Sequence, residues 1–104
     1  LGGREFTDLL YSMPDLASFE KAMWSDGFFV VDQWQLQELV ISAERAEVLF
    51  FSEGLSAEDR RHLLVPCLAS VEAGIAQALE RHGPQAEITV IPEGPYVLPV
   101  VAEC

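Results

Sequence analysis

The chain has 104 residues, half of them hydrophobic, which suffices for one domain with a core and gives no sign of a second. Seventeen acidic residues against six basic ones give a net charge of -11, which opposes binding to nucleic acid or to an anionic membrane surface. The longest apolar stretches, at 28–31 and 48–51, are far shorter than the roughly 20 residues of a membrane span. Neither a nucleic-acid partner nor a membrane partner is therefore predicted.

The first quarter of the chain predicts two short helices. Apolar residues recur there at helical spacing in two groups, and the second group follows Pro14 and Asp15, a typical helix start. Gly27 ends the second helix, and residues 28–31 (FFVV) are expected to be extended. The residues that define the two helices are Phe6, Leu9 and Leu10, then Leu16, Phe19 and Met23.

A third helix is predicted from Asp32 to about Glu44. Asp32 is the expected N-cap, with Gln35 three residues later in a variant of the capping box. The buried stripe of this helix is predicted to consist of Leu36, Leu39, Val40 and Ala43.

The second half predicts two strands with helices between them. Residues 46–52 are continuously apolar, as in a strand buried on both faces, and residues 87–91 form the second strand before a proline-rich loop. Between them, a short helix begins at Ser56 and ends before Pro66. A longer helix is capped by Ser70, carries its apolar face on Val71, Ile75, Ala78 and Leu79, and stops at Gly83.

This order of elements predicts an α/β fold: a β-α-β unit with parallel strands and packed helices. Two strands alone leave both sheet edges open, so at least one further strand, from outside this chain or from residues 28–31, is expected to cover them, and an open edge could also pair with a second copy of the chain. The missing strand and the absence of an initiating Met together favour a truncated part of a larger three-layer α/β domain.

The residues available for acid–base or nucleophilic chemistry are few. His82 lies in the last turn of a helix, where it interacts with the helix dipole, and His62 is expected to be a solvated surface residue. Glu58 and Asp59 lie in a first helical turn, where the dipole accounts for them better than an acid–base pair does. We predict no catalytic residue in this chain.

The sequence also contains no motif that indicates metal binding or redox chemistry. Cys67 and Cys104 have no CxxC or Cys/His ligand spacing, so a buried thiol and a loose terminal one are expected rather than a metal site. This cysteine usage and the lack of a secretory signal at the start of the sequence favour a cytoplasmic location.

Trp34 departs from this pattern. Each helical residue rotates by about 100°, which places Trp34 nearly opposite the predicted buried stripe, with Gln37 and Ile41 on its face and Gln33 at the edge. An exposed indole suits a partner or a ligand. The alternative, that Trp34 packs beneath a loop of its own domain, stays equally open.

Several segments of the chain resemble the C-terminal domain of nickel-pincer lactate racemase and its relatives, a family of 2-hydroxyacid racemases and epimerases. The resemblance rests on VDQWQLQ at 31–37, on AEVLFFSEGL at 46–55, and on the long segment at 69–99 that ends in PEGPYVLP, with weaker similarity at 2–10. Together these segments cover most of residues 1–104 in order.

The resemblance implies a two-domain enzyme in which a nickel-pincer nucleotide exchanges hydride with a small 2-hydroxyacid. The machinery belongs mainly to the N-terminal catalytic domain, the expected partner, and residues 1–104 would be part of the domain that closes the cleft. Trp34 matches the family's pocket tryptophan, and Gln33 is a further candidate for binding the cofactor. This chain alone is expected to bind no cofactor and to be inactive.

An alternative function from another class is a small non-catalytic α/β protein-interaction module. It would bind another protein, or another copy of itself, through the Trp34 face and an open sheet edge.

Overall fold

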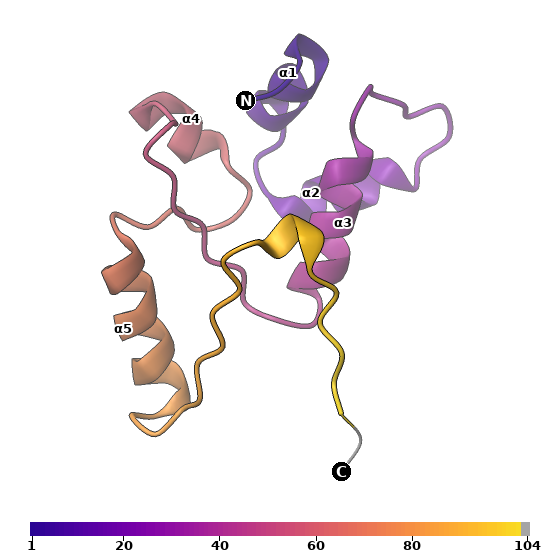
Figure 1. Cartoon of the computed structure of the whole chain (residues 1–104). Coiled ribbons are helices and arrows are strands. Elements are labelled where there is room, and N and C mark those ends of the chain that lie inside the picture. Colours follow the sequence, from indigo (N-terminus) through magenta and orange to yellow (C-terminus); the bar gives the residue numbers. More distant parts are fainter. Residues whose placement is uncertain (103–104) are drawn as a thin grey trace.

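The computed structural model describes residues 1–102 (Figure 1). Five α-helices and one 3₁₀ helix follow one another in this range, joined by turns and extended segments. Their bounds are α1 Arg4–Ser12, α2 Leu16–Met23, α3 Trp34–Ala43, α4 Ala57–His62, α5 Val71–His82 and η1 Gly94–Tyr96. Within residues 1–102 no helix is long and apolar enough to cross a membrane.

Local capping explains where three of the helices begin. The Asp15 carboxylate accepts the backbone N–H of Ser18 at 2.7 Å. Hydrogen bonding by the Ser18 side chain, and then this backbone bond, lowers the pKa of the Asp15 carboxyl. Ser56 and Ser70 accept the N–H groups of Asp59 and Ala73, each at 3.0 Å. These three helix starts confirm the sequence-based predictions, because a cap is a contact within four residues.

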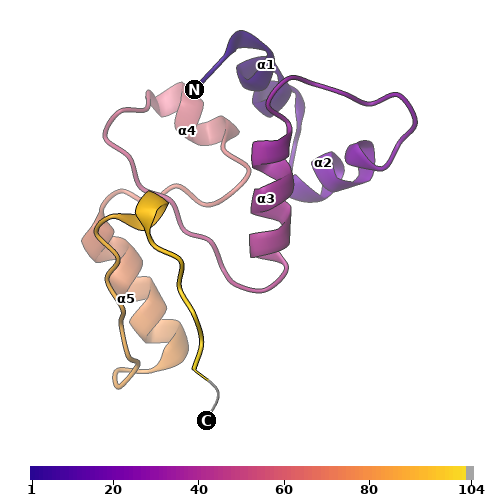
Figure 2. The same ribbon diagram turned by 45° about the vertical axis from the view of Figure 1, so that its right-hand side comes forward.

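The core lies in the first half of the chain, where α1, α2 and α3 meet. Phe19 is completely buried, and its ring meets that of Phe28 edge to face with centroids 6.3 Å apart. Phe28, Val30, Leu39 and Leu64 are among the half-buried residues that surround the core. The helices α2 and α3 lie side by side (Figure 2). The buried core residues are Leu9, Leu10, Phe19, Leu36 and Val40.

The predicted α/β fold is wrong for this structure. Residues 1–102 contain no strand and no sheet; extended pairing is limited to one isolated parallel bridge between Phe50 and Cys67. Two hydrogen bonds make this bridge, from the Phe50 N–H to the Pro66 carbonyl at 2.9 Å and from the Leu68 N–H to the Phe50 carbonyl at 2.7 Å. The predicted self-association through an open sheet edge therefore has no basis in the described structure.

The reason is that sheet formation depends on a distant partner. The segment 46–52 is paired at Phe50 alone, while 87–91 runs back near α5, with Val90 78% exposed (Figure 1). Apolar residues predict that a segment prefers to be buried, but a ladder requires a second segment in register. The contacts of this segment with α5 are made by side chains: the Glu47 carboxylate accepts the Gln77 amide at 3.5 Å and pairs with Arg81 at 2.7 Å.

The start of α3 also differs from the prediction. Asp32 is not the N-cap; it has a left-handed backbone with φ 66°, and Gln33 precedes the first helical residue, Trp34. The Asp32 carboxylate lies instead near Gly3, where α1 begins and a negative charge is favourable. The buried stripe is narrower than predicted, since Leu36 and Val40 are buried, Leu39 is half-buried and Ala43 is exposed.

Candidate functional site

The candidate site is the outward face of α3. Trp34 opens the helix with 60% of its surface exposed, on the side away from the buried Leu36 and Val40. Ile41 is exposed and Gln37 half-buried on the same face, as helical geometry predicts for positions three and seven residues further on. Within residues 1–102 no loop covers Trp34, so its packing beneath a loop finds no support in the described structure, and its part in binding stays a prediction.

Gln33 lies beside Trp34 but in a different environment. Its side chain is only 9% exposed, and its Oε1 accepts the Val30 N–H at 2.7 Å, while the Gln33 N–H donates to the Val30 carbonyl at 3.1 Å. These reciprocal bonds close the turn that leads from the extended 28–31 segment into α3. Gln33 thus positions Trp34 through the backbone, and its own part in cofactor binding stays a prediction.

Next to this turn, the extended segment forms one wall of a hollow against α1. The hollow has a volume of about 530 Å³, and its floor is mainly apolar. Phe29 and Val31, which line it, are exposed, so this part of the surface presents apolar side chains just before the turn into α3. Glu5, Asp8, Leu9, Ser12, Met13, Phe28, Phe29, Val30 and Val31 line the hollow.

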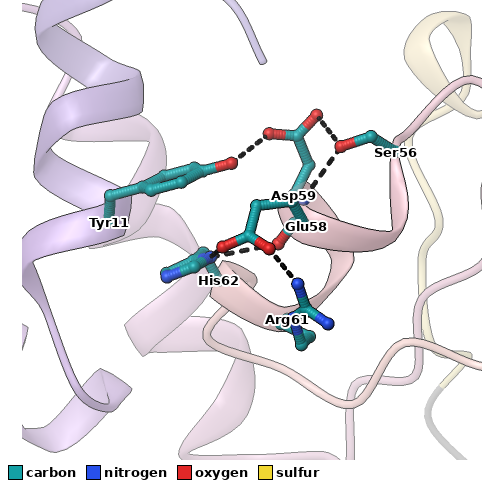
Figure 3. A network of polar contacts seen from close by, with 6 residues as sticks. All are labelled: Tyr11, Ser56, Glu58, Asp59, Arg61 and His62. Atoms are coloured by element: carbon teal, nitrogen blue, oxygen red, sulfur yellow. Dashed lines mark hydrogen bonds and ion pairs between the residues drawn. The ribbon is translucent and has the colours of Figure 1, made fainter.

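A polar cluster joins α1 to α4 (Figure 3). The Tyr11 hydroxyl donates to Asp59 Oδ1 at 2.7 Å, and the Tyr11 ring stacks on the His62 ring with centroids 3.9 Å apart. His62 Nδ1 lies 3.0 Å from the Glu58 carbonyl oxygen, and Glu58 also pairs with Arg61. His62 is therefore half-buried against Tyr11, so the prediction of a solvated surface histidine is wrong.

The electrostatics of this cluster favour structure over catalysis. Hydrogen bonds from Tyr11 and then from Ser56 lower the pKa of the Asp59 carboxyl, whereas a general acid at neutral pH needs a raised value. The bond to Asp59 is also the main cause of the raised pKa of the Tyr11 phenol. Asp59 therefore acts as a fixed acceptor that holds α4 against α1.

The remaining residues that the sequence analysis singled out lie outside both the α3 face and the polar cluster between α1 and α4. His82 lies exposed in the last turn of α5, as predicted. Cys67 is half-buried rather than buried, and Cys104 lies outside the described residues. Within residues 1–102 no three His, Cys, Asp or Glu side chains lie close enough to hold a metal ion.

Sequence reasoning missed Trp24 and the contact between Tyr11 and Asp59. Trp24 is the C-cap of α2 and is 79% exposed, and the turn residues that follow it were a signal for this exposure. Tyr11 and Asp59 are 48 residues apart, and no local pattern predicts their contact.

Comparison with known proteins supplies the class of this domain. The chain belongs to the lactate racemase C-terminal domain family, whose model matches residues 1–99. It is therefore the C-terminal domain of a lactate racemase-like protein, a type of domain that has an N-terminal partner domain. The comparisons with curated proteins and with solved structures gave no match.

Proposed function

We propose that this domain covers the active site of a nickel-pincer-dependent 2-hydroxyacid racemase or epimerase, and that Trp34 forms part of the pocket wall. The observation that carries the proposal is the indole of Trp34, which is 60% exposed on a face of α3 that no part of residues 1–102 covers. A large apolar ring in this position is typical of a surface that is buried by a partner or a ligand.

The role proposed for the residues of this domain is to cover the active site and to shape its pocket. The cofactor that the family implies supplies hydride transfer at the carbon that bears the hydroxyl group. Within the described range no three His, Cys, Asp or Glu side chains lie close enough to hold a metal ion. As the family resemblance implies, the proposal assigns the metal ligands and the acid–base groups to the N-terminal domain. Trp34 excludes water from the pocket and orients the bound molecule, while Gln33 holds the turn that presents Trp34.

Racemisation by the complete, cofactor-loaded protein tests this role. Trp34→Ala should lower kcat/KM for one lactate enantiomer about tenfold, which corresponds to about 1.4 kcal/mol of lost transition-state stabilisation. The thermal unfolding midpoint should not change, because Trp34 is outside the core. Chiral chromatography of the product measures the rate.

The matched control is Tyr96→Ala, which removes another exposed aromatic side chain far along the sequence. It should leave kcat/KM unchanged, and Trp34→Phe should recover part of the lost rate. Equal rates for Trp34→Ala and the wild type would contradict the wall role, and a complete protein that racemises no 2-hydroxyacid would contradict the proposed activity.

The alternative, a non-catalytic interaction module, is supported by a different observation. The segment 88–101 exposes many large apolar side chains, an amount that a monomeric domain rarely leaves in water. Light scattering at several protein concentrations distinguishes the two functions, since an interaction module that binds itself changes mass with concentration. The exposed side chains are Ile88, Val90, Ile91, Tyr96, Val97, Leu98, Val100 and Val101.

A further inference from the structure

Asp32 has a backbone conformation that residues other than glycine rarely adopt. Its φ of 66° is the only positive φ at a non-glycine residue within residues 1–102. Because the Gln33 N–H donates to the Val30 carbonyl at 3.1 Å, Asp32 is the third residue of a four-residue turn. Gly supplies a positive φ at this position freely and Asn and Asp tolerate it, whereas a side chain such as Ala strains it. The residue type at position 32 therefore suits the turn that ends directly before Trp34.

Contacts on both sides hold this turn. The Asp32 carbonyl accepts the Gln35 N–H at 3.1 Å and so joins the turn to α3. On the other side, Asp32 Oδ2 lies 3.9 Å from the position that a Cβ would have on Gly3, the N-cap of α1. Since α1 has no side-chain cap, a negative charge is favourable there.

The backbone of Asp32 is more distinctive than its charge. Glu5 brings a second carboxylate to the start of α1, with Oε2 3.7 Å from the same Cβ position on Gly3. The negative charge at this place is therefore supplied twice, whereas within residues 1–102 no other non-glycine residue has a left-handed backbone. A function of Asp32 is accordingly sought in the direction that it gives to the chain.

Trp34 depends on this direction because it is the first residue of α3. Its indole is 60% exposed, so its direction is set mainly by its backbone, whereas Leu36 and Val40 are fixed by burial in the core. A negative φ at residue 32 would turn away the carbonyl that accepts the Gln35 N–H. The first turn of α3, which carries Trp34, would then fray.

We propose that Asp32 is a positioning residue for Trp34: its left-handed backbone directs the chain from the extended segment 28–31 into α3 and so fixes the direction of the indole. The inference deepens the proposed function and rests on it, because that function places Trp34 in the pocket wall. Asp32 itself contacts neither substrate nor cofactor in this scheme. Gln33 closes the same turn through its two bonds to Val30, so both residues act on Trp34 through the backbone.

The complete protein, labelled with 5-fluorotryptophan, tests the positioning without an activity assay. Trp34→Phe identifies the fluorine resonance of Trp34 by its disappearance. Asp32→Ala should shift and broaden this resonance, whereas Asp32→Asn, which tolerates a positive φ, should leave it in place. The matched control is Asp26→Ala, at an exposed residue of the preceding turn whose φ is not positive, and it should leave the Trp34 resonance unchanged. All these variants should stay folded, because neither aspartate belongs to the core.

Racemisation by the cofactor-loaded protein tests the functional consequence. Asp32→Ala should lower kcat/KM about fivefold, which is less than the loss expected from Trp34→Ala. In the Trp34→Ala background the same change should have no further effect, because the side chain that Asp32 positions is gone. Asp32→Asn should recover most of the rate, and Asp26→Ala should keep all of it.

Three results would overturn the proposal: a Trp34 resonance that Asp32→Ala leaves unchanged, an Asp32→Asn variant that behaves like Asp32→Ala, or a loss of rate from Asp32→Ala that is equally large without the Trp34 indole. The two proposals can fail separately. If Trp34→Ala racemises at the wild-type rate while the Trp34 resonance depends on residue 32, the role in the pocket wall fails. If Trp34→Ala is slow while Asp32→Ala changes neither resonance nor rate, the positioning role alone fails.

Discussion

Replacing Phe19 by alanine is the most stringent test of the three-helix core. Phe19 is the one described side chain with no exposed surface, and it joins α2 to α1, α3 and the ring of Phe28. An aromatic side chain buries about 150–250 Å². At about 25 cal/mol per Å² this is worth about 4–6 kcal/mol, an upper bound because the unfolded chain is partly compact.

Truncation of a core phenylalanine costs about 3–5 kcal/mol in well-packed proteins, so Phe19→Ala should destabilise the domain by about 4 kcal/mol. Small domains are stable by only about 5–15 kcal/mol, and this core contains five buried side chains. We therefore expect the variant to be close to unfolding in water. Phe19→Leu, which fills most of the volume, should cost less than about 1.5 kcal/mol.

Urea unfolding, followed by the helical circular dichroism signal, measures these differences. Phe29→Ala is the matched control, since Phe29 is 80% exposed and should lose less than about 0.5 kcal/mol. A double-mutant cycle between Phe19 and Phe28 should give a coupling of about 0.5–1.5 kcal/mol for the edge-to-face pair. The packing described above is refuted if Phe19→Ala costs no more than Phe29→Ala.

Two further predictions concern α4 and α5. Tyr11→Phe should raise the pKa of the Asp59 carboxyl toward its ordinary value, as measured by NMR titration, and a pKa equal to that of the wild type would contradict the Tyr11–Asp59 bond. The pKa of the Asp59 carboxyl is lowered in the folded state, so Asp59 stabilises the fold above its unfolded-state pKa and loses this contribution as the pH falls through its folded-state pKa. The pKa of the Tyr11 phenol is raised in the folded state, so Tyr11 loses its stabilising contribution as the pH rises through its folded-state pKa. In Tyr11→Phe the loss of stability at acid pH should therefore be smaller, and the loss at alkaline pH should be absent, because the variant has no phenol at position 11. Ser70→Ala removes the cap on the Ala73 N–H and should cost α5 about 1 kcal/mol, seen as about fivefold faster hydrogen exchange of its amides, whereas exchange in α3 should be unchanged.

Predictions that depended on neighbouring residues were mostly confirmed. The caps at Asp15, Ser56 and Ser70 are contacts within three residues, and the outward direction of Trp34 follows from the rotation per residue in a helix. The N-cap of α3 is the exception. Asp32 has the residue type of a cap, but its backbone is left-handed and its carboxylate lies near the start of α1, a contact between residues distant in the sequence.

Predictions that depended on distant partners could not be made reliably. The apolar stretches at 46–52 and 87–91 have strand composition, yet the structure pairs Phe50 with Cys67 only and leaves Val90 exposed. A hollow between α2 and α3, whose lining includes Glu20, Trp24 and Glu44, likewise exists only because these two helices pack on each other. Whether an apolar segment becomes a strand is decided by hydrogen bonds to another segment, which composition does not contain.

The sequence by itself determined the helices and most of their starts, the acidic surface, the outward face of Trp34 and, through its resemblance, the family. Each of these depends on residue type or on spacing within a few positions. The tertiary structure alone decided the absence of a sheet from residues 1–102, the stacking of His62 on Tyr11, and the hollow between α2 and α3. Those features require segments far apart in the chain to meet, and their energies depend on the packing of both partners.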